Sequence, residues 1–248
     1  MTIVPAANAA ALSEDIFAIR ARFGFTECDL LKSSSSSKPE HCTVDQHRQA
    51  KNATIEAVHK NCGTFIGYAK FNRDNDDPIR NRVYGYHSLL EKFDKFLKNK
   101  KSYGSVIFDN LEWSRSEEFG RPRDFITEKF QRGLTFDKKK TWKRLAQIVS
   151  YSMTHEGTSN LLSANDILTG SLRYVANGPK DGPRVDLIKS LHKCLWHDEK
   201  GVSREFGLIL RPKGRDKLPK SIQAEYDALR FFMNKAVVGD SAEDLEGK

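Results

Sequence analysis

The stretch LLSANDILTGSLRYVAN, residues 161–177, has the apolar spacing of one amphipathic helix and carries a single acid, Asp166. At 100° per residue, the apolar side chains share one side and Asp166 falls on the opposite side. Two interpretations are open. Ser163 and Asp166 have the spacing of a capping box at a helix start, which needs no chemistry. Alternatively, Asp166 meets other acids in space and takes part in a reaction.

A second acid, Asp109, follows the apolar run Val106–Phe108, which predicts a strand buried on both faces. Functional groups in α/β sheets gather at strand ends, and Asp166 opens the helix after the next strand. Adjacent strands would bring the two carboxylates within reach of one Mg²⁺, and Gly170, one turn after Asp166, leaves room beside it. A pair of such ions can clamp a phosphodiester and activate water. The alternative for Asp109 is an ordinary Asp-Asn turn.

Helices and strands alternate in the expected secondary structure, which predicts an α/β fold around a mostly buried sheet. We expect one α/β domain over residues 1–237, interrupted by a flexible Ser-rich loop at 33–42. Residues 238–248 are expected to form an acidic, disordered tail. The expected helices cover 12–23, 43–60, 79–97, 123–132, 161–177, 184–196 and a last segment from 219, and the expected strands cover 64–71, 103–110, 145–153 and 204–212. Thr43-Val-Asp-Gln46 predicts a capping box at the start of the helix over 43–60, and Asn61-Cys62-Gly63 predicts its end.

The charge of the chain points to a polyanionic partner, with nucleic acid as the first candidate. Lysine and arginine number 41 against 33 acids, a net charge of +8. The densest basic stretch is residues 132–144, where a tryptophan among the cations could stack on a base. An ordinary solvated lysine-rich loop is the alternative. The candidate nucleic-acid-binding residues are Lys138, Lys139, Lys140, Trp142, Lys143 and Arg144.

Several protein classes are excluded by the sequence. No run approaches the roughly 18 apolar residues of a membrane span, so no membrane partner is expected. The first residues lack the basic start of a signal peptide. The four cysteines are scattered, without a C-x-x-C motif, which is typical of reduced thiols in a cytoplasmic protein. The spacing of His41, Cys42 and His47 fits no zinc pattern.

The order VIFDN, then THEGTSNLLSANDILTGSLRYVAN, then FGLILRPK resembles the bacterial family called domain of unknown function 3800. LLKSSSSSKP is similar to that family's glutamate-leucine-lysine-serine stretch, with Lys32 and Ser33 matching, Leu30 at the glutamate position and Asp29 adjacent. The resemblance covers roughly residues 15–235. It implies a ribonuclease H-like mixed sheet flanked by helices and a nuclease-type site with Mg²⁺ or Mn²⁺. Asp109 and Asp166 would be the catalytic metal ligands, with Asp29 a third.

Family members begin with a strand that ends in Asp-Glu-Ser-Gly, a motif that this chain lacks. The resemblance therefore implies an N-terminally truncated fold, with one carboxylate fewer and a tendency to self-associate through an open sheet edge. Two functions remain open. One is a metal-dependent phosphodiester hydrolase, or an inactive descendant of one. The other is a non-catalytic nucleic-acid-binding or protein-interaction protein that uses its basic surface.

Overall fold

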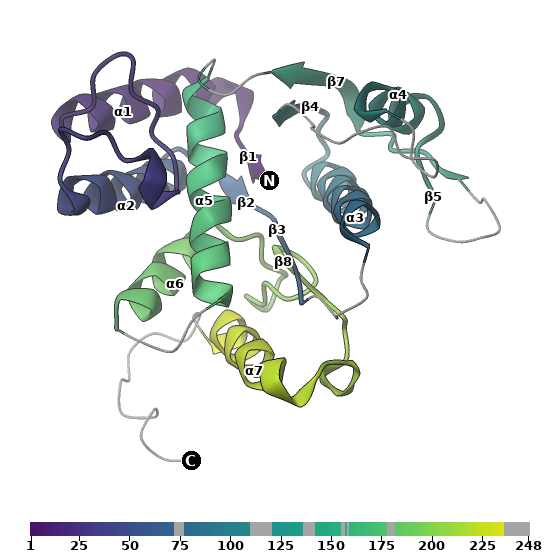
Figure 1. Cartoon of the computed structure of the whole chain (residues 1–248). Helices are drawn as coiled ribbons and strands as arrows, with labels where there is room; N and C mark the ends of the chain where they lie inside the picture. Colours follow the sequence, from purple (N-terminus) through teal and green to yellow (C-terminus); the bar gives the residue numbers. More distant parts are fainter. Residues whose placement is uncertain are drawn as a thin grey trace. The chain divides into compact units, whose positions relative to one another are not determined.

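The chain folds into two compact units in the computed structural model (Figure 1). The first comprises residues 1–71 and 164–248, and the second comprises residues 72–163. The structure describes residues 1–71, 77–109, 121–135, 142–154, 157, 159–177 and 182–235. The predicted acidic tail lies outside these residues. The single domain expected over residues 1–237 stays a prediction.

The fold is mixed α/β, as the alternation of helices and strands predicted. The described strands form four two-stranded sheets. Two are parallel, β3 (Gly67–Lys70) with β8 (Leu208–Arg211) and β4 (Gly104–Asp109) with β7 (Ile148–Thr154). Two are antiparallel, β1 (Thr2–Ile3) with β2 (Thr64–Phe65) and β5 (Leu134–Thr135) with β6 (Trp142–Lys143).

The first unit surrounds the segment that contains β2 and β3, which forms hydrogen bonds on both edges. On one edge, the Ile66 N–H donates to the Met1 carbonyl over 2.9 Å. On the other edge, the Gly67 N–H donates to the Gly207 carbonyl over 2.7 Å. Helix α1 packs on α2, and α2 packs on α6 (Figure 1). The described helices of this unit are η1 (Ala6–Asn8), α1 (Ala9–Arg22), η2 (Ser35–Ser37), α2 (Val44–Lys60), α6 (Gly182–Cys194), η3 (Arg215–Lys217), α7 (Lys220–Lys235) and, from Ala164 onward, α5 (Asn160–Ala176).

Local sequence signals set the ends of α2. The Thr43 hydroxyl accepts the Gln46 N–H over 3.1 Å, and the Gln46 side chain accepts the Thr43 N–H over 2.8 Å. This reciprocal pair is the capping box that the sequence predicted. The helix ends at Lys60, where Cys62 takes a positive φ of 56° before Gly63. The predicted helix stop is therefore confirmed.

The second unit holds α3 (Pro78–Asn99) and α4 (Pro122–Arg132) with the β4–β7 and β5–β6 pairs. The Asp77 carboxylate accepts the N–H groups of Ile79 and Arg80 and so caps α3. Further along α3, the buried Asp94 accepts the Gln147 N–H over 2.9 Å, which ties the helix to the segment before β7. A nonlocal hydrogen bond thus complements the apolar packing of α3.

The prediction that β4 is buried on both faces is wrong. Val106 and Phe108 are buried, but Ile107 on the opposite face is 57% exposed. The partner strand places Ser152 beside Ile107 and Ser150 beside Ser105, where the two serine hydroxyls form a 2.7 Å hydrogen bond. A short apolar run therefore marked the strand correctly but not its environment. In the part of the chain that the structure describes, no helix has the length and apolar character needed to cross a membrane.

We expect acid to destabilise the second unit through His87. This side chain is 4% exposed on α3 and stacks on Phe125 of α4, with ring centroids 5.7 Å apart. Burial, with a smaller contribution from Lys129, lowers the pKa of His87 to about 4. The folded unit holds the His87 ring neutral. The contribution of this ring to the free energy of unfolding is therefore complete above pH 6.5 and is lost as the pH falls from 6.5 to about 4. The expected loss in the free energy of unfolding is about 3 kcal/mol.

Hydrogen exchange of the α3 amides between pH 7 and pH 4 measures this loss. His87→Phe keeps an aromatic ring without a titrating nitrogen and should flatten the pH dependence. His59→Gln, at an exposed position of α2, is the matched control. An unchanged pH profile in His87→Phe contradicts the assignment.

Candidate functional site

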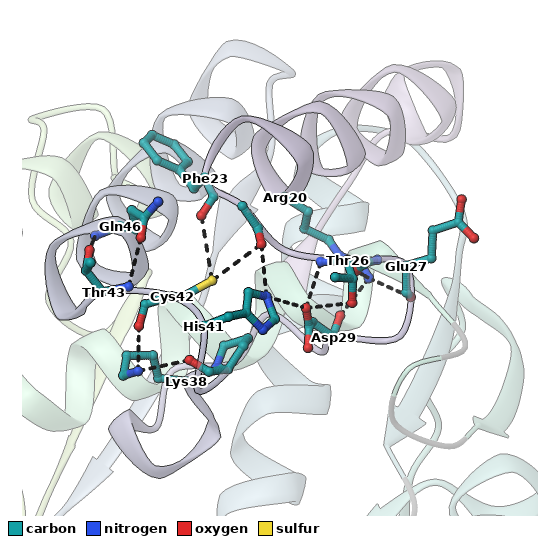
Figure 2. Close-up of polar contacts among 12 residues, drawn as sticks. Arg20, Phe23, Thr26, Glu27, Asp29, Lys38, His41, Cys42, Thr43 and Gln46 are labelled. Carbon is teal, nitrogen blue, oxygen red and sulfur yellow. Dashed lines mark hydrogen bonds and ion pairs between the residues drawn. The ribbon is translucent and has the colours of Figure 1, made fainter.

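The loop between α1 and α2 is held by side chains of α1 and of the loop itself (Figure 2). The Arg20 guanidinium donates to the carbonyl oxygens of Thr26, Glu27 and Asp29 over 3.1, 3.0 and 2.6 Å. The Lys38 ammonium donates to the carbonyls of Pro39 and, over 2.6 Å, Cys42. The Ser-rich segment between these anchors forms η2. The loop that was predicted to be flexible is therefore anchored at both ends.

Asp29, the predicted third metal ligand, shapes this loop. Its Oδ2 accepts both the N–H and the hydroxyl of Thr26, each over 2.7 Å, and lies 3.2 Å from His41 Nε2. The Thr26 hydrogen bonds, followed by the charges of His41 and Arg20, lower the pKa of Asp29. The contacts give Asp29 a structural role, and its metal-binding role stays a prediction.

His41 and Cys42 belong to the same anchored loop. His41 Nε2 lies 3.1 Å from the Gly24 carbonyl, and the Cys42 thiol donates to the carbonyls of Gly24 and Phe23 (Figure 2). Burial raises the pKa of Cys42, so the thiol stays protonated at neutral pH. Because the thiolate is the reactive form, this environment fits a structural cysteine and not a nucleophile.

The Ser-rich loop and α5 meet in the first unit through Ser33 and Asp166. The Ser33 N–H donates to Asp166 Oδ2 over 2.6 Å, across 133 residues of sequence. Lys51 of α2 donates to the Ser33 carbonyl over 3.2 Å, and His47 Nε2 lies 2.9 Å from the Lys32 carbonyl. Burial lowers the pKa of Lys51, and the charge of Asp166 acts in the opposite direction. A carboxylate, an amine and an imidazole therefore converge on the backbone groups of Lys32 and Ser33.

The start of α5 differs from the prediction. The helix begins at Asn160, where the Ser159 hydroxyl accepts the Leu161 N–H over 3.2 Å. Ser163 and Asp166 consequently lie inside the helix, and the capping-box interpretation of this pair is wrong. Asp166 is exposed, and the adjacent Asn165 accepts the Thr2 N–H over 2.9 Å. Neighbouring residues of α5 thus hold β1 and the Ser33 loop.

Asp109 stands at the end of β4, as predicted, and is exposed. It belongs to the second unit, whereas Asp166 belongs to the first. That the two carboxylates meet therefore stays a prediction. Within the first unit, Asp29 accepts the Thr26 N–H and Asp166 accepts the Ser33 N–H.

The described residues do not supply a complete metal site. Across them, no group of three or more histidine, cysteine, aspartate or glutamate side chains could hold an ion. In the first unit, Asp166 offers one exposed carboxylate whose Oδ2 accepts the Ser33 N–H. Mg²⁺ sites use one or two protein carboxylates together with substrate phosphates and water. The predicted Mg²⁺ or Mn²⁺ therefore stays a prediction, with Asp166 as the carboxylate of this unit that could contribute to such a site.

The predicted nucleic-acid-binding residues lie in the second unit, with Lys138, Lys139 and Lys140 outside the described residues. Trp142 is half-buried on β6, with Lys129 Nζ 5.0 Å and the Arg132 guanidinium 5.8 Å from its ring centroid. Lys129 also lies 5.2 Å from the Phe125 ring.

Lys143 is ion-paired with Glu91 of α3 over 2.9 Å. Arg132 and Arg144 are exposed. The tryptophan therefore sits among cations in the folded protein, with arginines that reach solvent beside it.

Sequence reasoning missed the residues that anchor the loop, namely Arg20, His41, His47 and Lys51. One signal was present in the spacing. His47 and Lys51 are one turn apart on α2, next to the buried Ala50 and Thr54. Polar side chains beside an apolar helix face indicate partners elsewhere in the fold.

No protein-family model, no curated protein and no solved structure matches this chain.

We expect Gly170→Ala to destabilise the first unit. Alanine normally favours a helix interior by about 1 kcal/mol over glycine. Here a Cβ at position 170 would lie 1.5 Å from Ser33 Oγ and 2.3 Å from Ser33 Cβ. Overpacking of this kind costs about 1–3 kcal/mol, so the net change in the free energy of unfolding should be unfavourable.

Chemical denaturation of the native protein and of Gly170→Ala measures this change in the free energy of unfolding. Ser33→Gly removes both clashing atoms, so adding Gly170→Ala in that background should be stabilising. If Gly170→Ala stabilises the native background as well, the loop does not approach α5 as described.

Proposed function

We propose that the protein binds nucleic acid through the basic surface of the second unit. Residues 72–163 contain 18 lysines and arginines and 13 acids, a net charge of +5. The first unit is longer and contains 23 basic and 20 acidic residues, a net charge of +3. The excess positive charge is therefore concentrated in the second unit, where it would attract phosphates.

The observation that carries this proposal is the combination of Trp142 with exposed arginines. The Arg132 guanidinium lies 5.8 Å from the ring centroid, and both side chains reach solvent. A guanidinium near an aromatic ring keeps its charge and its N–H groups available for phosphate oxygens. Aromatic rings and guanidinium planes are also the groups on which unstacked bases pack. Arg144, two residues after Trp142, adds a further exposed charge.

Binding should weaken as salt rises, because neutralised phosphates release counterions. Fluorescence anisotropy with labelled single- and double-stranded oligonucleotides from about 50 to 200 mM salt measures this slope. Arg132→Gln combined with Arg144→Gln should reduce the logarithmic slope by about 2, one for each lost phosphate contact. Arg48→Gln with Lys200→Gln, two exposed positions of the first unit, is the matched control. A flat salt response, or equal slopes in both double variants, contradicts the proposal.

A metal-dependent phosphodiester hydrolase is the second candidate. It is favoured by the 2.6 Å contact of Ser33 with Asp166, since these residues come from the two stretches on which the family resemblance rests. A ribonuclease H-like arrangement would be compatible with the parallel pairs β3–β8 and β4–β7. In this function Asp166 would help to hold the metal ion at the reacting phosphate and would also accept the Ser33 N–H.

Asp166→Asn tests this second candidate, because asparagine keeps an oxygen for the Ser33 N–H while it removes the charge. The second candidate predicts Mg²⁺- or Mn²⁺-dependent cleavage of DNA or RNA that Asp166→Asn abolishes while oligonucleotide affinity is retained. Asp45→Asn, at an exposed position of α2, is the control. If the native protein does not cleave either substrate, catalysis is excluded and the binding proposal stands by itself.

A further inference from the structure

The imidazole rings of His192 and His197 face each other at the end of α6. Their Nε2 atoms are 3.2 Å apart, and their ring centroids are 4.3 Å apart. His192 is 6% exposed, and His197 is half-buried. Neither the nucleic-acid surface nor the Ser33 loop uses this pair.

We propose that His192 and His197 form a chelating site for a divalent transition metal of the Zn²⁺, Ni²⁺ and Cu²⁺ class. Zinc–imidazole bonds are about 2.0–2.1 Å long, so two nitrogens on a tetrahedral ion lie about 3.3 Å apart. The observed Nε2 separation of 3.2 Å matches this spacing. Imidazole ligands favour these metals over Mg²⁺ and Ca²⁺, which prefer oxygen.

The proton balance of the site is simple. The direct contact needs one Nε2 that carries a proton and one that accepts it. Coordination through both Nε2 atoms requires the donating ring to move its proton to Nδ1, a change of tautomer without net proton loss.

The electrostatic surroundings favour a cation. His192 lies in the last turn of α6, where the helix dipole is negative. The Asp198 carboxylate acts on the neighbouring His197 with a negative charge. No third histidine, cysteine or carboxylate joins the pair among the described residues, so water would complete the coordination. The ion would bind more weakly than in a four-ligand structural site.

The site would stiffen a specific junction. Between the two histidines, Leu195 pairs with Phe65 in a parallel bridge, and the Trp196 N–H donates to the Phe65 carbonyl over 3.3 Å. A metal held by both histidines would close the turn that carries this pairing. The expected consequence is increased protection of the Trp196 amide against hydrogen exchange.

Titration calorimetry of the full chain with Zn²⁺ alone tests the proposal. Because the exposed thiols of Cys28 and Cys62 also bind zinc, the Cys28→Ser/Cys62→Ser background is used. One ion per chain is expected, and His197→Gln should weaken binding at least about tenfold. His59→Gln, exposed on α2, should leave the affinity unchanged. Equal affinity in the His197 and His59 variants overturns the site.

Nuclear magnetic resonance of the histidine rings keeps the test valid if a variant fails to fold. In the protein with intact histidines, Zn²⁺ should shift the ring signals of His192 and His197 together, and Mg²⁺ should not. If zinc leaves both ring signals in place, the pair is an ordinary histidine–histidine hydrogen bond.

Discussion

The arrangement of the Ser33 loop in the first unit depends on a nonlocal contact, the hydrogen bond from the Ser33 amide to the Asp166 carboxylate. A donor–acceptor distance of 2.6 Å with a charged acceptor makes this a strong hydrogen bond. It forms only because Gly170 leaves the loop room to approach α5. Once Ser33 is fixed, Lys51 and His47 can reach the adjacent carbonyls. The backbone groups of a loop without regular structure are thus satisfied by side chains.

This constraint also determines what the acids of the first unit can do. Asp29 and Asp166 both accept backbone N–H groups. A carboxylate has about four acceptor positions on its two oxygens, so holding a loop does not exhaust it. The difference lies in the surroundings. Asp29 Oδ2 contacts Thr26 and His41, whereas exposed Asp166 lies next to a half-buried lysine. Of the two, Asp166 is therefore better suited to an additional ligand.

Features encoded in adjacent residues could be predicted from the sequence, and features that need distant partners could not. The capping box of Thr43 and Gln46 was correct because the four residues involved satisfy each other. The same reasoning misplaced the start of α5, since Ser159 provides the hydroxyl and Ser163 lies inside the helix. The apolar run around Ile107 marked a strand, but burial of its second face would need a covering element.

In the candidate site, too, the contact between distant residues could not be predicted from the sequence. Asp166 and Lys32–Ser33 were recognised as two separate stretches, yet nothing in their local sequence indicates that they touch across 133 residues. Gly170 was expected to leave room beside Asp166, and the structure fills that room with Ser33. Residue types therefore identified the participants, while the pairing between them depends on how α5 packs in the first unit.

Several cations described above differ between the two units in what their N–H groups contact. In the first unit, Arg20, Lys38 and Lys51 donate to carbonyl oxygens, which fixes their N–H groups in the loop. In the second unit, Lys129 and Arg132 lie over the Trp142 ring. Lys129 is buried and donates to Glu128, whereas Arg132 is exposed and its ring contact does not consume its N–H donors. Only donors that remain available can bind phosphate. The proposed attraction of a polyanion therefore relies on exposed cations of the second unit such as Arg132, whereas Arg20, Lys38 and Lys51 are committed to the loop of the first unit.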